Sequence, residues 1–445
     1  MNPFWDRLRS LTGAMDPVTV ALAGSVVVVA VVLLYLSKRR IEWILVGVVA
    51  SAAFIGSFSA TVDSVAAFVR WAGIGILTTL ILVRRTPFAR GSVLFFLIYA
   101  MTGFLFLYQS LDFGYQLQRG LLLIATSIAI PSTAAIIAKD GVSLKRLYLY
   151  IGIIGSLTAM MAAVQLPGHI GIAGRFTVNS MGVPAFAILL GSLLPFTFVA
   201  IWHGHNLLTR SFFILTFALG GICLLLTAQR AGTIAGLIAL TPIVLGLSKS
   251  QRLWVAALIG VAAIVLVLWG GGLVDRNLEV IRNRYSLNAG MSNRDLIWAD
   301  AYSRLSENFF AGRGTGAAEN AFGESFHQSY LEAWFNAGPV GLLCFIAAQV
   351  RAVYVAWSLA RRRGGQLKKE SSLSLGIILG FCFLSFFEST PAGASSISVI
   401  LFLLTAAAME ICYQQIAPGT GDGSLRPARR RLKRAHSSSA AEVPL

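Results

Sequence analysis

The chain has 445 residues, of which 56% are hydrophobic and only 12% are charged, and its formal net charge is +17. A soluble globular domain carries about 25% charged residues. This deficit, together with repeated apolar runs long enough to cross about 30 Å of hydrocarbon, predicts an all-α integral membrane protein and excludes a soluble globule. A membrane β-barrel would show short segments of alternating polarity, whereas these runs are continuous.

The positive charge gathers in short connections beside the apolar runs, as at 38–40 and 361–363, and in the C-terminal tail at 429–434. Such clusters set the topology and meet anionic lipid head groups, so membrane lipids are expected partners and nucleic acid is not. The cysteines lie inside apolar runs and are expected to pack rather than to form disulfides or bind zinc: Cys223, Cys344, Cys382 and Cys412.

A bundle of about 12–13 transmembrane helices is predicted. The thirteen apolar runs are 18–36, 41–60, 65–83, 92–108, 118–138, 147–166, 182–202, 211–228, 231–248, 253–270, 338–358, 373–389 and 396–414. The positive-inside rule places the basic connections in the cytoplasm and the alternate loops outside. The predicted units are ten helices with short loops over 1–270, a partly helical outward loop over 271–337, three helices over 338–414, and a basic disordered cytoplasmic tail over 415–445.

Several arginines lie at the outer level of these runs. In chain order they are Arg70 and Arg119 within spans, Arg175 in the outward loop 167–181, and Arg230 between two apolar runs. Cations at such depth cost several kcal/mol unless they are paired or hydrated, and they tend to mark ligand pathways. With few outward carboxylates beside the spans, they favour an anionic ligand such as a lipid diphosphate. A chloride site, or anchoring of helices to head groups, is an open alternative.

The outward loop contains two predicted helices. Ser292 is expected to cap the first, on which Arg294, Trp298, Tyr302 and Leu305 follow at helical spacing. The run Gly312-Arg313-Gly314-Thr315-Gly316 then predicts a turn. No strand precedes it and no phosphate-loop lysine follows it, so it is not expected to bind phosphate as such a loop does.

The second loop helix is predicted to begin near Ser325, with His327 in its first turn and Phe326, Tyr330 and Trp334 on one face. The chain has five histidines, three of which lie on the predicted cytoplasmic side, so no histidine metal site is expected. A lone histidine is most often a surface or capping residue. His327 is nevertheless a candidate general base, because its neutral form exists near pH 7.

These residues carry a resemblance to a known family. The run from His327 to Leu331, followed by Gly338 to Leu342, resembles the "HNxxL…GxxGL" signature of the O-antigen ligase and polymerase superfamily. The upstream stretch is similar to its "GR…W…GxG" element, Gln229-Arg230-Ala231-Gly232 to its "SRxG" element, and Arg175 with Asn179 to its "GR…N" loop. Two positions depart from the pattern: Gln229 replaces a serine and Gln328 an asparagine.

The resemblance implies a metal-independent glycosyltransferase of the bacterial inner membrane, with its active site facing the periplasm and no cofactor. The donor would be an undecaprenyl-diphosphate-linked saccharide and the acceptor a glycan or glycolipid. His327 would be the catalytic base, and Arg230, Arg294, Arg175 and Arg70 would bind the donor diphosphate. The chain has no Asp-x-Asp motif of the kind expected for metal-dependent nucleotide-sugar transferases.

The resemblance leaves the acceptor open. A polysaccharide polymerase, for which a chain-length regulator is a candidate partner, is slightly preferred to an O-antigen ligase acting on lipid A–core. Functions of other classes are a transporter or flippase of lipid-linked glycans and a non-catalytic scaffold. A transporter would often show internal repeats or paired broken spans, which are not evident in the sequence.

Overall fold

The computed structural model describes the helical bundle and part of the segment that follows residue 270. The described residues are 41–54, 60–84, 91–110, 112–169, 175–178, 181–204, 206–253, 294–307, 310–322, 326–362, 368–389 and 396–416. The predicted spans 18–36 and 253–270, the predicted Ser292 cap and the basic tail lie outside these residues.

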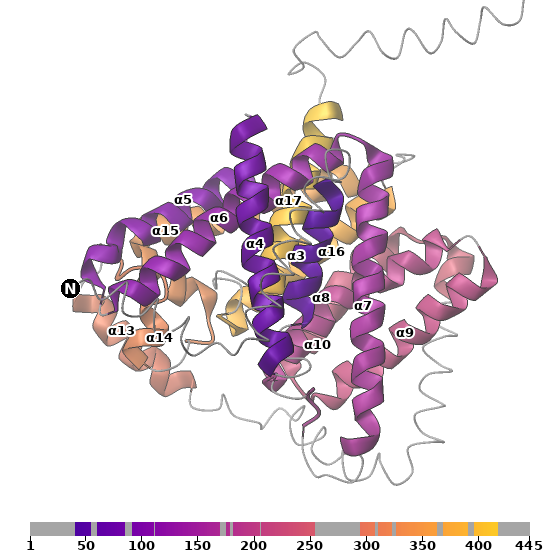
Figure 1. Ribbon diagram of the computed structural model, residues 1–445, viewed down its shortest axis with the longest axis horizontal. Helices are drawn as coiled ribbons and strands as arrows, with labels where there is room; N and C mark the ends of the chain where they lie inside the picture. The colour runs from indigo at the N-terminus through magenta and orange to yellow at the C-terminus, as the bar shows by residue number, and fades with distance from the viewer. Residues whose placement is uncertain are drawn as a thin grey trace, which may run out of the picture.

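Within the described residues the chain is helical and contains no strand (Figure 1). The helices are α3 Ile41–Phe54, α4 Ala60–Arg84, α5 Ser92–Leu105, the 3-10 helix η2 Phe106–Gln109, α6 Phe113–Ala138, α7 Gly141–His169, α8 Val183–His203, α9 Leu207–Leu226, α10 Arg230–Gly246, α13 Arg294–Glu307, α14 Ala317–Phe322, α15 Ser329–Ala360, α16 Lys368–Phe387 and α17 Ile397–Ile416. Each predicted apolar run in this part of the chain corresponds to a helix.

Nine of the helices in the described part are long and apolar enough to cross a membrane, while α3 and α10 are shorter. The prediction of an all-α, multi-pass membrane protein is therefore confirmed. The helices α8 and α17 are the most buried of the nine, and α4 and α9 are the least buried. Because lipid is as apolar as leucine, close packing rather than exclusion from water selects which faces turn inward.

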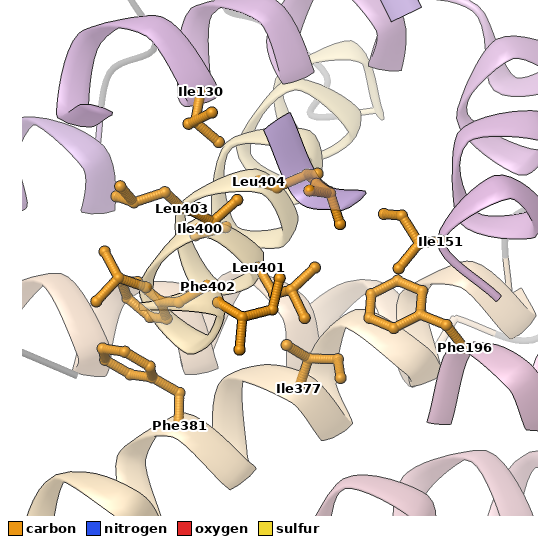
Figure 2. Close-up of a cluster of buried hydrophobic side chains, with 14 of the residues drawn as sticks. Ile130, Ile151, Phe196, Ile377, Phe381, Ile400, Leu401, Phe402, Leu403 and Leu404 are labelled. Atoms are coloured by element: carbon orange, nitrogen blue, oxygen red, sulfur yellow. The ribbon is translucent and has the colours of Figure 1, made fainter. Parts of the chain in front are cut away.

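The centre of the bundle is α17. Its residues Ile400 to Leu404 have no exposed surface, and side chains from four other helices surround them (Figure 2). The neighbours are Ile130 of α6, Ile151 of α7, Phe196 of α8, and Ile377 and Phe381 of α16. The rings of Phe381 and Phe402 stack with their centroids 4.2 Å apart.

The short helix α10 packs between α8 and α16 through small residues. A Cβ atom on Gly376 of α16 would lie 1.9 Å from the carbonyl oxygen of Ala239, and one on Gly232 would lie 2.8 Å from the backbone of Ala187. Such close backbone approach requires glycine, as at many membrane helix interfaces. The position of α10, and with it the position of Arg230 at its first residue, is therefore set by both neighbours.

The long helix α15 is broken at Gly338, whose φ of 68° is in the left-handed region that favours glycine. Pro339 follows and has no N–H to donate to the carbonyl of Phe335 four residues earlier. The N–H of Arg313 donates to this carbonyl instead, at 2.8 Å, and the N–H of Gly314 donates to the carbonyl of Asn336 at 3.0 Å. Segment 311–314 therefore replaces the helical hydrogen bonds that the break removes.

Candidate functional site

The segment that holds His327 packs on the start of α15. The helices α13 and α14 lie together at this end of the bundle (Figure 1), which we call the α13–α14 end. Ala301, Leu305 and Phe326 are buried in one small apolar cluster, and Trp298 packs against it. The predicted amphipathic helix from Arg294 through Leu305 is confirmed in this respect, although Tyr302 is 52% exposed rather than part of the buried face.

His327 lies before α15 rather than within it. The predicted helix start near Ser325 is wrong, because α15 begins at Ser329 and His327 has a left-handed backbone with φ 52°. The predicted common face is also wrong: Phe326 and Trp334 belong to the small cluster, whereas Tyr330 packs against the main core. The turn at His327 separates Phe326 from α15, so Phe326 does not share a helical face with Tyr330.

Hydrogen bonds on both sides of His327 hold this turn. The indole Nε1 of Trp298 donates to the carbonyl oxygen of Phe326 at 2.8 Å. On the other side, the N–H of Gln328 donates to the hydroxyl of Ser389 at 3.1 Å, and the hydroxyl of Ser329 donates to the carbonyl of Glu388. A left-handed non-glycine residue costs about 1–3 kcal/mol and persists only where the surroundings enforce it, which is typical of functional sites.

Glu388, directly after α16, is the partner of the His327 ring. Its Oε2 lies 3.3 Å from Nδ1 of His327, and its Oε1 accepts a hydrogen bond from Nε2 of Gln229 at 2.7 Å. Glu388 is 2% exposed, whereas the His327 side chain is 31% exposed. A buried carboxylate that accepts the Nδ1 proton leaves Nε2 with a free lone pair, which is the arrangement of an oriented general base.

Gln229 and Arg230 begin α10. Gln229 is the N-cap residue, and its side chain accepts a hydrogen bond from the N–H of Gly232. Ala228 before it has φ 49°, so that Ala228 and His327 are the non-glycine residues with positive φ in the described part of the chain. His327 contacts Glu388 directly, and Ala228 directly precedes Gln229, which donates a hydrogen bond to Glu388. Backbone strain in the described residues is thus concentrated around one carboxylate.

Arg175 lies against the turn formed by Thr227, Ala228 and Gln229, directly before α10. Its Nε donates to the carbonyl oxygen of Thr227 at 3.0 Å, and the N–H of Phe176 donates to the carbonyl of Leu226 at 3.0 Å. The hydroxyl of Thr227 in turn accepts from the N–H of Gln229. The structure therefore brings Arg175, Arg230 and His327, which are far apart in the sequence, to one end of the bundle.

Arg70 and Arg294 are placed differently. Arg70 is on α4 and Arg119 is on α6, and neither residue is on the turn that precedes Arg230. Arg119 donates to Glu319 of α14 at 2.9 Å, and the hydroxyl of Tyr115 donates to the same carboxylate. The expected lack of carboxylates near these arginines is wrong at this point. Arg294 is the first residue of α13, and its side chain lies outside the described part.

Glu388 was not predicted from the sequence. It closes the predicted span 373–389, and a carboxylate at the end of an apolar run is a signal of function. Glu332, in the first turn of α15, is also buried. Among the described residues, no group of three histidine, cysteine or acidic side chains has the arrangement of a metal site.

Comparison with known proteins finds a family match over part of the chain. Residues 215–346 match the O-antigen ligase family. The match confirms the resemblance to the O-antigen ligase and polymerase superfamily. The matched region includes Arg230, Arg294 and His327, whereas Glu388 lies after it. A search of curated proteins finds no match to the chain.

Proposed function

We propose that the protein is a metal-independent glycosyltransferase that uses a saccharide linked to a lipid diphosphate, of the undecaprenyl type, as its donor. The observation that carries the proposal is the His327–Glu388 pair, which lies beside the Arg230 end of α10; His327 and Arg230 are within the O-antigen ligase family match. The membrane is the bacterial inner membrane, and the α13–α14 end faces the periplasm, on the side that the charge pattern predicts for these loops.

In the proposed reaction, Nε2 of His327 accepts the proton of an acceptor hydroxyl. The acceptor oxygen forms a bond to C1 of the donor sugar, and the bond from C1 to the diphosphate oxygen breaks. The electron pair of that bond leaves with the lipid diphosphate, whose negative charge must be neutralised. Glu388 stabilises the histidine cation that results.

The arginines supply the diphosphate site in this proposal. Arg230 and Arg175 lie at the turn directly before α10, which Gln229 and Glu388 connect to His327. Arg294 begins α13, whose Trp298 holds the turn at His327. Arginine suits this role because its planar guanidinium group binds phosphate oxygens bidentately. Arg70, deeper on α4, is proposed to contact the donor from the other side of the site.

The acceptor separates two forms of the activity. A polysaccharide polymerase, with a second lipid-linked repeat as acceptor and a chain-length regulator as candidate partner, is preferred. An O-antigen ligase acting on lipid A–core is the alternative. Purified protein is supplied with lipid-linked donor, with and without lipid A–core, and products are separated by size. Transfer only in the presence of lipid A–core would reject the polymerase.

His327→Ala tests the chemistry itself. We expect near-complete loss of product at unchanged protein level, because no other described group at this site has the position of His327 relative to Glu388. A chelator is expected to leave the parent activity unchanged, since arginines neutralise the diphosphate. Normal product from His327→Ala would reject the mechanism, and full transport of lipid-linked glycan by that variant would favour a flippase instead.

A further inference from the structure

Gln229 connects two parts of the candidate site. Its Oε1 accepts the N–H of Gly232 and so caps α10, while its Nε2 donates to Oε1 of Glu388 at 2.7 Å. Gln229 is 5% exposed, so water does not compete for either hydrogen bond. One amide group therefore fixes both the start of α10, which carries Arg230, and the carboxylate that contacts His327.

The residue type matters for this connection. A serine, which the family signature has at this position, is a good N-cap residue. Its hydroxyl oxygen, however, ends two bonds nearer the backbone than the amide nitrogen of Gln229, and it cannot cap α10 and reach Glu388 in the same way. The departure from the signature thus adds a hydrogen bond that the signature residue would not make.

We propose that Gln229 is a positioning residue for the transfer reaction: it holds the Glu388 carboxylate toward His327 and ties it to the Arg230 end of α10. The proposal rests on the proposed function. With Oε1 held by Gln229, Glu388 presents Oε2 to Nδ1 of His327 at 3.3 Å. Without the amide, rotation about the terminal bond of Glu388 is free of this restraint, because such torsions have broad energy wells.

The groups that share this environment determine how the test depends on pH. Around the Gln229–Glu388 bond they are His327, Arg230 on α10 and Arg175 on the 175–178 segment, together with Glu332, which is buried in the first turn of α15. The two arginines keep their charge across the working range. A carboxyl group introduced next to Glu388 would change the pH profile, because two carboxylates at one site share a proton.

Gln229→Glu is therefore the informative substitution. It keeps an oxygen that can cap α10 but replaces the amide donor with a group that donates only when protonated. At about pH 9 we expect kcat to fall at least about 10-fold, with donor KM within about threefold, since repulsion replaces a hydrogen bond to a charged group. As the pH falls to about 6, the ratio of variant to parent rates should rise, because the protonated carboxyl group can donate to Glu388.

Asn206→Asp is the matched control. Asn206 caps α9 by accepting the N–H of Thr209 at 2.8 Å, at the end of α9 away from Thr227. The same amide-to-acid change there should leave the ratio to parent constant with pH. Parent-like rates for Gln229→Glu at all pH values, or a deficit that does not vary with pH, would overturn the positioning role. An active His327→Ala variant in the same assay would instead reject the proposed function.

Discussion

Glu388→Gln is the substitution that tests the catalytic pair most directly, because it preserves shape, removes the charge and replaces one of the two acceptor oxygens with an amide donor. The carboxylate lies 3.3 Å from Nδ1 of His327 and is 2% exposed. At an effective dielectric constant of about 20, two unit charges at that distance attract by roughly 5 kcal/mol. An amide oxygen in the same place would recover part of this, so a net loss of about 2–3 kcal/mol is the expected cost.

This cost arises only when His327 carries the proton, and therefore it affects the transition state more than the bound substrate. We expect kcat to fall roughly 30- to 150-fold while the donor KM changes by less than about threefold. Initial rates of saccharide transfer from purified lipid-linked donor, at varied donor concentration, measure both. A Glu388→Gln variant with the parent kcat would refute the orientation of His327 by Glu388. A raised KM at unchanged kcat would place Glu388 in substrate binding instead.

Two further substitutions test how the site is held. Trp298→Phe removes the hydrogen bond to the carbonyl of Phe326, so activity should fall about 5- to 10-fold with little loss of stability; Trp43→Phe, on the distant α3, is the control and should leave rates unchanged. Gly312→Ala would place a Cβ 2.4 Å from the carbonyl oxygen of Asn336 and should destabilise the protein by about 1–3 kcal/mol in thermal unfolding in detergent. Gly221→Ala on α9, where nothing lies within 4 Å, should not, and equal effects of the two changes would contradict the close packing.

The helices and the order of the motifs were predictable because both are local. Apolar runs of membrane length determine the spans, and the spacing from Arg294 to Leu305 gives the helix that α13 confirms. Arg230 was likewise predicted at a helix end from its position between two apolar runs. Each of these predictions depends on residues within a single helix or directly beside it.

The geometry around His327 was not predictable in this way, because distant residues enforce it. Its ring partner Glu388 is 61 residues away in the sequence, and Gln229 is 159 residues from Glu388. A left-handed turn at a histidine has no local signal, since its cost is offset only by these contacts. The pairing of Arg119 with Glu319, 200 residues apart, was missed for the same reason.

The break in α15 has a consequence for variation in loop length. The amides of Arg313 and Gly314 are bound to the carbonyls of Phe335 and Asn336, so the intervening chain starts and finishes at fixed points on a membrane helix. The free energy of closing such a loop rises only slowly with the number of residues in it. Insertions between these anchor points that leave α14 and the His327 turn intact are therefore expected to cost little free energy while both anchor points stay in place.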